Sequence, residues 1–432
     1  MGLHRLFHLS LLAAGLHAAT AGAQAPVLQP VAVASFNMAW AGTLDDFKQH
    51  AAVCAAPKVN WCETRARWAP GTTQATPEET ARAATCQAAV LEAAGGREAA
   101  ARLAPCNAYG GVSARGPGGV SLDVSALRRP EAYADKLDGL RATVESLIQR
   151  DGVRVIAFQE VKSTEAVRAV LGRFNESFEV CAARHEGFQT LAFAWDRTLG
   201  KAATCTTQAT LAVQDPPPRP AAEPATAPAD TRRVRPGLEL RLDVNGAAVG
   251  FLNLHLKAGC ASATSSNPRY PARMITDAVD SCEVLNRQVP LLETWIDAAL
   301  RRSPRLVVLG DFNRRLDEEQ ALALPREQVR SDGSNPAGVP VAGPDGRVST
   351  RYLWPELADG TRQLVLLPLK QVDPACKGFA GLDHIVVSGP LQAALAPLAP
   401  EQAGARKTAV VSRPGQAMET SDHCPQVARL LL

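Results

Sequence analysis

The stretch of sequence that decides the fold reads RLVVLGDFN, at residues 305–313. Its first half is a short apolar run, typical of a strand that is buried on both faces. Its second half places a carboxylate and an amide, Asp311 and Asn313, where that strand ends. An ionised carboxylate in an apolar setting is costly unless it is paired, hydrogen-bonded or bound to a metal. The stretch therefore predicts a core strand that delivers polar groups to a site at its end.

The same pattern recurs at the ends of other apolar runs. Read one at a time, these polar residues have ordinary roles, such as capping a turn, opening a helix or binding backbone amides. Their repetition along one chain favours a shared site, at an edge where several strands end. The runs are VAVASFN (31–37) with Asn37, VRVIAFQEV (153–161) with Glu160, VGFLNLHL (249–256) with His255, LDHIVVS (382–388) with Asp383, and the motif SDHCP (421–425) with Asp422 and His423.

Apolar runs alternate with amphipathic stretches along the chain, which indicates an α/β fold. Residues 133–152 and 282–302 each place apolar side chains on one helical face. Pro290 is expected to kink the second of these helices or to delay its start. We predict a sandwich of two packed, mostly antiparallel sheets with outer helices. Further strands are expected at residues 191–195, 238–244 and 427–432.

The chain resembles the endonuclease/exonuclease/phosphatase superfamily, which includes secreted deoxyribonucleases, abasic-site endonucleases, sphingomyelinases and inositol polyphosphate phosphatases. Six motifs carry the resemblance, in the order SFN, FQE, NLHLK, GDFN, LDH and SDH, from about residue 31 to the end of the chain. The resemblance implies a four-layer α/β sandwich with its site where the two sheets open at one edge. It also implies a deoxyribonuclease-like, metal-dependent phosphoesterase of the secreted bacterial type.

The resemblance implies a metal site at these strand ends. Glu160 is expected to bind the metal, with Asn37 beside it and Asp422 as a second carboxylate. Mg²⁺ is the expected ion, with Mn²⁺ or Ca²⁺ as alternatives, because it prefers hard oxygen ligands and keeps several waters.

The resemblance also implies roles in the hydrolysis itself. His423 is expected to handle a proton or contact the phosphate, held in tautomer and charge by Asp383. Asp311 would orient or deprotonate the attacking water. Asn313 would donate a hydrogen bond to the phosphoryl oxygen, and His255 would stabilise the developing charge or protonate the leaving group.

Contacts to the substrate are less constrained by the sequence. Lys257 lies two residues beyond His255, on the same face of the strand, which suits a phosphate contact, although a solvated lysine at a strand edge fits equally well. Arg314, directly after the GDFN motif, is a further candidate. Deoxyribonucleases carry additional tyrosine, arginine or acidic residues after the glutamate motif, whereas this chain reads ARHEGFQTLAFAW (183–195) there. Gln189, Glu186 and His185 are the candidates that remain in that stretch.

The first 25 residues predict a secretory signal peptide. Arg5 precedes an apolar run, and small residues follow where a peptidase could cut. A membrane anchor or a buried first helix is the alternative, but polar residues interrupt the run, and it is short for a membrane span of roughly 20 residues. We expect a secreted or periplasmic protein without stable membrane insertion.

Ten cysteines follow this segment, and their even number permits disulfides in such a compartment. No two of them have the close spacing of a zinc site. Cys260 follows the strand of His255 and Cys282 opens the next helix, so these two are expected to bond. Two further bonds are expected on similar grounds, Cys181–Cys205 and Cys376–Cys424.

Two regions differ in composition from the rest of the chain. Residues 44–130 are rich in alanine, carry four cysteines, and are expected to form a helical, disulfide-stapled insertion. Residues 214–236 are rich in proline and are expected to form an exposed loop. Because the motifs extend from Asn37 to His423, we expect residues 26–432 to form one domain.

The net charge of +3 loses the charge of Arg5 with the signal peptide, and +2 is too small to attract nucleic acid by itself. Our first hypothesis is a monomeric phosphodiesterase that acts on nucleic acid. The second is a phosphatase or phospholipase-type enzyme for a small phosphoester, a phosphoinositide or sphingomyelin. The third is a secreted binding protein that has kept the fold and lost catalysis.

Overall fold

The computed structural model describes residues 28–67, 75–106, 108, 125–215, 233–267, 271–323, 352–358, 363–376, 381–395 and 403–432. The predicted signal peptide lies outside these residues, as does most of the proline-rich loop. The expected insertion at 44–130 is described in part.

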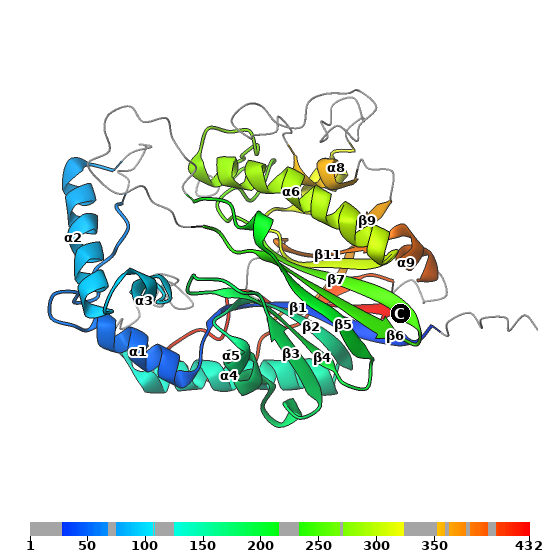
Figure 1. Ribbon diagram of the computed structural model, residues 1–432, viewed down its shortest axis with the longest axis horizontal. Coiled ribbons are helices and arrows are strands. Elements are labelled where there is room, and N and C mark those ends of the chain that lie inside the picture. The colour runs from blue at the N-terminus through cyan, green and yellow to red at the C-terminus, as the bar shows by residue number, and fades with distance from the viewer. Residues whose placement is uncertain are drawn as a thin grey trace, which may run out of the picture.

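Two sheets pack face to face at the centre of the molecule (Figure 1). Most neighbouring strands are antiparallel, and the parallel pairs are β1–β2, β10–β12 and β7–β8. In spatial order the first sheet contains β10 (Leu369–Val372), β12 (Ala405–Lys407), β13 (Gln426–Leu431), β1 (Pro30–Ala41), β2 (Val153–Val161), β4 (Thr190–Asp196) and β3 (Phe178–Ala182). The second contains β5 (Lys201–Gln208), β6 (Gly237–Val244), β7 (Ala247–His255), β8 (Arg305–Asp311), β11 (Asp383–Ser388) and β9 (Leu364–Leu366).

Helices cover the outer face of each sheet, so the predicted four-layer sandwich is confirmed. In Figure 1, α4 and α5 lie below the first sheet, and α6 and α8 lie above the second. No described helix is long and apolar enough to cross a membrane. The helices are α1 (Leu44–Cys54), α2 (Pro77–Ala93), α3 (Arg97–Ala101), α4 (Pro130–Gln149), α5 (Thr164–Leu171), α6 (Asp280–Arg302), α7 (Leu316–Ala321), α8 (Leu353–Ala358) and α9 (Gly389–Ala394).

Three apolar cores fill the sandwich, one between the sheets and one under the helices on each side. Because successive side chains of a strand point to opposite faces, each central strand contributes to two of these cores. In β1, Val31 and Val33 face the core between the sheets, while Ala34 and Phe36 face the core under α4. Other central strands alternate in the same way between the middle core and an outer core. Strands buried on both faces read as continuous apolar runs, which is why the sequence pattern located them.

All eight expected strands are present, and both expected helices form as α4 and α6. Strands β3, β5, β9, β10 and β12 were not predicted, because they are short or lie at sheet edges and lack a continuous apolar run. Pro290 lies inside α6, which begins at Asp280, so the proline does not delay the start of the helix.

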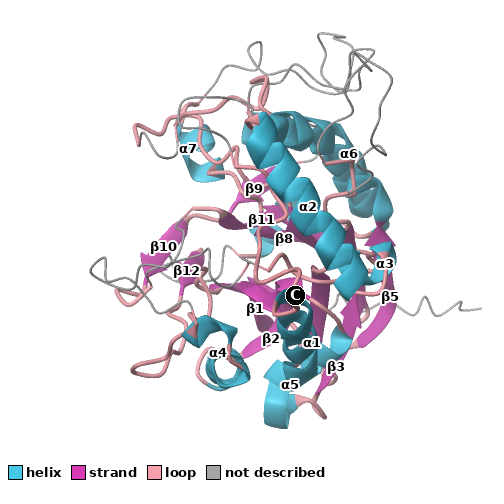
Figure 2. Cartoon of the chain, turned by 90° about the vertical axis from the view of Figure 1, so that its left-hand side faces the viewer, coloured by secondary structure: helices cyan, strands magenta, loops and turns pink. Residues whose placement is uncertain are grey.

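Helices α1, α2 and α3 form a helical lobe, which we define as the described residues between Leu44 and Cys106. The lobe lies at the left-hand end of the sandwich, toward which β1 runs (Figure 1). Viewed from that side, α1 and α2 stand in front of the strand ends (Figure 2). The lobe therefore covers the end of the sandwich that the sequence predicts to hold the site.

Five disulfides staple the described chain, and no described cysteine is free. Cys54–Cys106 and Cys62–Cys86 both lie in the helical lobe. The expected bond Cys260–Cys282 is confirmed, with 5.2 Å between its α-carbons. The expected bonds Cys181–Cys205 and Cys376–Cys424 are confirmed as well.

Candidate active site

Three neighbouring strands of the second sheet bring three predicted site residues into line. In the parallel pair β7 and β8, His255 lies beside Asp311, and in the antiparallel pair β8 and β11, Asp383 lies beside Asp311. Gly310 permits this spacing, since a β-carbon there would lie 2.1 Å from the Leu254 carbonyl oxygen and its φ is +141°. The glycine of the GDFN motif is therefore required by the close approach of β7 to β8.

The first sheet supplies Asn37 from β1 and Glu160 from β2. The Asn37 amide Nδ2 donates to Asp311 Oδ2 across the sandwich, at 3.1 Å. Glu160 Oε1 lies 3.6 Å from His255 Nε2, and Glu160 has a φ of +59°, at a register shift between β2 and its neighbours. Such a conformation is unusual for a residue other than glycine and is typical of functional sites. Here it turns the Glu160 carboxylate out of the strand toward the second sheet.

A buried polar bridge joins the two sheets behind these residues. Gln159 Nε2 donates to Asn253 Oδ1 at 2.7 Å, and Ser35 Oγ donates to Gln159 Oε1 at 3.3 Å. Asn253 Nδ2 in turn donates to the carbonyl oxygens of Phe158 and Ala192. Satisfied buried networks of this kind fix one arrangement of the groups that they connect. The bridge therefore sets how β2 and β7 stand relative to each other just before Glu160 and His255.

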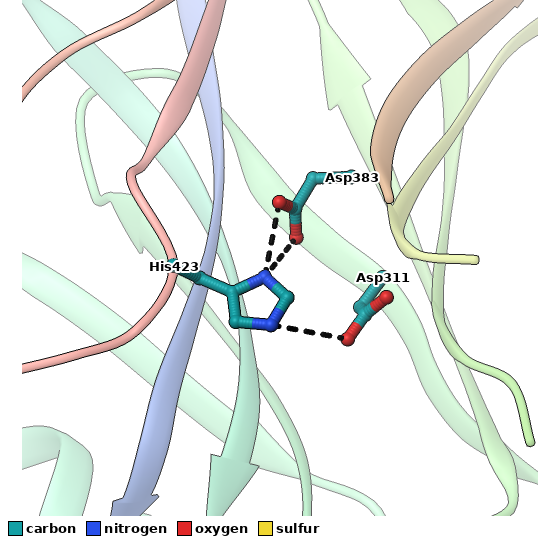
Figure 3. A group of neighbouring side chains, drawn as sticks. All are labelled: Asp311, Asp383 and His423. Carbon is teal, nitrogen blue, oxygen red and sulfur yellow. Dashed lines mark hydrogen bonds and ion pairs between the residues drawn. The ribbon is translucent and has the colours of Figure 1, made fainter. Parts of the chain in front are cut away.

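The SDH motif reaches the same place from the loop before β13. Ser421 Oγ donates to the Asn37 carbonyl oxygen at 2.7 Å, which holds the loop against β1. His423 Nδ1 lies 3.1 Å from both carboxylate oxygens of Asp383, and His423 Nε2 lies 3.8 Å from Asp311 Oδ2 (Figure 3). Residues from Asn37 to His423 thus converge at one edge, and we call Asn37, Glu160, His255, Asp311, Asp383 and His423 the strand-end site.

Two carboxylates keep His423 charged although it is buried. Burial disfavours the imidazolium, but Asp383 and Asp311 outweigh burial and raise the pKa of His423 to about 10. For Asp383, burial alone would raise the pKa, yet the charges of His423 and Lys407 hold it well below its usual range. Lys407 Nζ lies 2.9 Å from Asp383 Oδ2. Lys407, Asp383 and His423 therefore form a buried row of alternating charges.

Asp311 lies between two histidines in different states. Burial, together with the nearby Asp383, raises the pKa of Asp311 to about 7, although His423 and the amide donors of Asn313 and Asn37 act against this shift. His255 Nε2 is 3.5 Å from Asp311 Oδ2. Burial and the charges of Arg235 and His423 lower the pKa of His255 well below its usual value, so its ring is neutral. The edge thus pairs a cationic histidine with a neutral one around a single carboxyl group.

The predicted substrate contacts Lys257 and Gln189 lie on the β7 side of the site. Lys257 Nζ pairs with Asp215 Oδ2 at 2.7 Å. Arg235, which the sequence analysis did not single out, donates to Gln189 Oε1 at 2.7 Å and to the carbonyl oxygens of His255 and Leu256. Its guanidinium therefore braces the end of β7 beside Lys257.

The structure gives Arg314 a role other than substrate binding. Its side chain is fully buried, and Nε donates to Glu319 Oε1 at 2.6 Å. Its Nη1 donates to the carbonyl oxygens of Cys260 and Arg273. A buried arginine needs such partners, and these tie the loop after Cys260 to α7. Position after the GDFN motif was a misleading signal, because Arg314 points into the protein.

Asn313 lies two residues beyond Asp311, with a φ of +51°. Its backbone N–H donates to Asp311 Oδ1 at 2.8 Å, and its side-chain Nδ2 donates to the Leu256 carbonyl oxygen at 3.0 Å. The residue therefore orients Asp311 through its backbone. One N–H of its amide is already used, and the other is the one that could serve a phosphoryl oxygen.

Two sets of residues could hold a metal. Asp311, Asp383 and His423 offer ligand atoms within 4.8 Å of one another. The charges of Asp383 and Asp311 favour the protonated form of His423, so a metal held by this set would have to displace that proton. The oxygens of Glu160, Asn37 and Asp422 are hard donors that suit Mg²⁺, and the Glu160 side chain is 23% exposed. The second set is the one that the sequence analysis expected, and Glu160 gives it a partly exposed ligand.

Sequence reasoning missed four residues at or beside the site: Asn253, Lys407, Arg235 and Lys136, whose Nζ donates to the Thr420 carbonyl oxygen next to the SDH motif. Asn253 stands inside the NLH motif, two residues before His255, so its polar side chain in an apolar run was a usable signal. The three cationic residues had no such signal, because lysine and arginine are usually solvated.

Comparisons with known proteins give little similarity in sequence. No family model and no curated protein matches the chain. Among solved structures, an endonuclease/exonuclease/phosphatase family protein from Bacteroides thetaiotaomicron is 10% identical, covers 94% of this chain and 97% of its own, and has a TM-score of 0.44. Caenorhabditis elegans TDP2 is 13% identical, and the match covers 69% of this chain and 92% of that protein, with a TM-score of 0.37. The human Nocturnin catalytic domain is 13% identical, covers 68% and 87%, and has a TM-score of 0.35. Similarity at this level assigns neither a family nor an activity, which are inferred below from the residues of the site.

Proposed function

We propose that the protein is a divalent-metal-dependent phosphodiesterase of the endonuclease/exonuclease/phosphatase type that acts on nucleic acid. One observation carries this proposal: polar residues spread from Asn37 to His423 meet at one sheet edge, where a cationic histidine and a neutral histidine flank a carboxyl group of raised pKa. A structural role explains this poorly, because buried charges of this kind destabilise a core that could be apolar.

The donor chemistry fits a hard divalent cation. Glu160, Asn37 and Asp422 would hold it through oxygen atoms, whereas all described cysteines are bonded to one another and offer no thiolate. Asp422 and Glu160 both act on the same neighbour: burial lowers the pKa of Lys136, and the charges of both carboxylates oppose that shift. When bound, the cation would neutralise charge on the phosphate.

The chain's own residues supply the proton chemistry. Asp311, with its pKa near neutrality, is suited to accept a proton from the attacking water. His423 is a charged donor and suits a phosphate oxygen or the leaving oxygen, while Asp383 holds it protonated and oriented. The neutral ring of His255 can donate a hydrogen bond from Nε2 without adding charge. The opposite pKa shifts therefore assign different roles to the two histidines, which the sequence alone did not distinguish.

Cationic residues beside the site support a polyanionic substrate. Burial is the main cause that lowers the pKa values of Lys257 and Arg235, and Arg65 contributes to both shifts. The exposed Arg65 belongs to the helical lobe, in a segment that Arg82 anchors through the carbonyl oxygens of Glu63 and Arg65. The lobe thus adds a positive charge to the rim of the edge that it covers, which suits the neighbouring phosphates of a nucleic acid strand.

An activity panel tests the proposal. The substrates are plasmid DNA, RNA, an inositol phosphate, sphingomyelin and bis(p-nitrophenyl) phosphate, each with Mg²⁺, Mn²⁺ or Ca²⁺. We expect nucleic acid and the chromogenic diester to be cleaved, EDTA to abolish cleavage, and Mg²⁺ to restore it. Cleavage of sphingomyelin or the inositol phosphate alone would replace nucleic acid with that substrate class. Lack of cleavage of every substrate would favour a binding protein.

A matched pair of arginine variants tests the substrate class more sharply. Arg65→Ala should raise KM for DNA about three- to tenfold, with little effect on the small chromogenic diester, which lacks neighbouring phosphates. Arg67→Ala is the control, because Arg67 is an exposed arginine on the same segment that is paired with Glu63 at 2.6 Å. Equal effects of the two substitutions would show that only overall charge matters.

A further inference from the structure

Helix α4 has a second, polar face in addition to the apolar face that packs on the first sheet. Its apolar residues, such as Leu137 and Leu140, belong to the core under the sheet. Gly139 lies on the polar face, where a β-carbon would be 2.4 Å from Thr420 Oγ1 and 2.8 Å from the Val411 carbonyl oxygen. The helix therefore approaches the segment from Val411 to Thr420 too closely for any other residue at position 139.

Polar contacts hold that segment on α4 along its whole length. Arg413 pairs with Asp135 and Asp138 at the exposed rim. Thr143 Oγ1 accepts a hydrogen bond from the Val411 N–H at 2.9 Å, at the end far from the site in sequence. Lys136 Nζ donates to the carbonyl oxygens of Thr420 at 2.8 Å and Glu419 at 3.4 Å, at the end next to the SDH motif.

Lys136 is an unexpected residue at this place, because its side chain is 2% exposed. A methionine would fill similar volume without the cost of burying an ammonium group, and buried charges are commonly no more stabilising than apolar replacements. Burial lowers the pKa of Lys136 to about 8, and the carboxylates of Asp422, Glu160 and Glu419 oppose the shift. The group is thus mainly charged at neutral pH, within electrostatic reach of two expected metal ligands.

We propose that Lys136 is a positioning residue for His423, which fixes the backbone at 419–420 and thereby sets where the SDH loop presents its side chains. Two residues separate the anchored carbonyl of Thr420 from His423, and the first of them, Ser421, is bonded to β1. Two fixed points, one on a helix and one on a strand, therefore define the path of the loop. The inference rests on the proposed hydrolase function of the site.

The test compares three variants of the full chain. Lys136→Met removes the charge and the donors at nearly constant volume, and Lys136→Arg restores both. Thr143→Val is the matched control, since it removes a buried hydrogen bond to the other end of the same segment. Hydrogen–deuterium exchange of residues 411–423 measures anchoring without reference to activity, and hydrolysis of bis(p-nitrophenyl) phosphate at saturating Mg²⁺ gives kcat and KM.

We expect Lys136→Met to increase exchange at residues 419–423 and to lower kcat about 10- to 100-fold with KM changed less than threefold, because a displacement near 1 Å in a catalytic group has about this effect. Lys136→Arg should recover part of kcat, and Thr143→Val should keep kcat within about twofold while exchange rises near Val411.

Other results would overturn the inference. Unchanged kcat in Lys136→Met, or an equal loss in Thr143→Val, would leave Lys136 with a purely structural role. Faster exchange throughout α4 and the first sheet in Lys136→Met would also indicate a purely structural role for Lys136. If the wild-type protein hydrolyses nothing, the proposed function fails, and unchanged exchange at 419–423 in Lys136→Met would separately exclude the anchor.

Discussion

His423 of the strand-end site and His50 of the helical lobe are both buried, and these two histidines are in opposite protonation states. His423 is 6% exposed and His50 is 0% exposed, so burial penalises the imidazolium of both. For His50, burial dominates and lowers the pKa to about 4, with a smaller opposing effect from the Ala104 backbone. For His423, Asp383 and Asp311 overcome burial and raise the pKa. The site thus maintains buried charge, and the lobe avoids it.

The surroundings of the two rings agree with this difference. His50 lies among aromatic rings, about 6 Å from the centroids of Trp40, Phe47 and Trp61, and near the sulfur of Cys54. Such contacts stabilise a neutral ring and a compact lobe. Substitutions in the site should therefore change activity much more than substitutions in the lobe, which should change stability.

The largest expected effect on activity is that of His423→Ala. Loss of a group that transfers a proton or donates to developing charge should lower kcat about 10²- to 10⁴-fold, because it acts mainly in the transition state. Asp311→Ala should do the same. Neither side chain fills the apolar core, and both variants keep the buried Lys407–Asp383 pair, so the melting temperature should fall less than in a variant that removes the Asp383 charge. Steady-state kinetics and thermal melting at saturating Mg²⁺ test this. A His423→Ala protein that melts normally and keeps more than about a tenth of kcat would exclude this histidine from the mechanism.

Asp383→Asn is expected to have the next largest effect. The change keeps volume but removes the charge that holds His423 protonated, so kcat should fall about 10- to 100-fold. It also leaves Lys407 buried without its anionic partner, which should lower the free energy of unfolding by roughly 3 kcal/mol. The double variant Asp383→Asn/Lys407→Met should regain stability without regaining activity. Recovery of kcat in the double variant would show that Asp383 acts only through stability.

Lys257→Ala should have a smaller effect, confined to substrate binding. A residue that grips a phosphate in both ground and transition states changes KM, and about three- to tenfold is expected, equivalent to roughly 1 kcal/mol. Asp215 competes with the substrate for Lys257, so Asp215→Asn should lower KM. Steady-state kinetics of both variants with DNA as the substrate test these two changes in KM. A fall in kcat at unchanged KM in Lys257→Ala would place Lys257 in the chemical step instead.

Buried strands with polar ends could be predicted from the sequence because two opposing signals coincide in them. An apolar run fixes a strand, and a carboxylate or imidazole at its end has no role in packing. Asn37, Glu160, His255, Asp311 and Asp383 all follow this rule, and neighbouring strands then bring them together. Local sequence was sufficient to predict these residues, because the pairing of neighbouring strands brings residues that are distant in sequence close together in space.

The supporting cations could not be predicted in this way. Lys136 and Lys407 can be identified only from their contacts in the folded protein. Lys136 binds Thr420, which is 284 residues away in sequence, and Lys407 binds Asp383, which is 24 residues away. Arg314 shows the opposite error, since a position next to a motif suggested a substrate contact and the backbone turned the side chain inward. The burial of long cationic side chains depends on tertiary partners, and single-sequence patterns do not contain them.

The smallest expected effect on activity is that of His50→Gln, which should change only the pH dependence of stability. The folded-state pKa of about 4 lies below the ordinary value of 6.5, so the unfolded chain takes up the proton first as pH falls. The stabilising contribution of neutral His50 is complete above pH 6.5 and decreases as pH falls toward 4, by about 2 kcal/mol at pH 5. Glutamine does not titrate, so the variant should lose that much less stability than wild type between pH 7.5 and pH 5.

Denaturant unfolding at the two pH values measures the difference, and other titrating groups cancel between the two proteins. Activity at pH 7.5 should stay within about twofold of wild type, because His50 packs in the helical lobe against Trp40, Phe47 and Trp61. Equal losses of stability in both proteins would show that His50 is already protonated or accessible in the folded lobe, and the contrast with His423 would then fail.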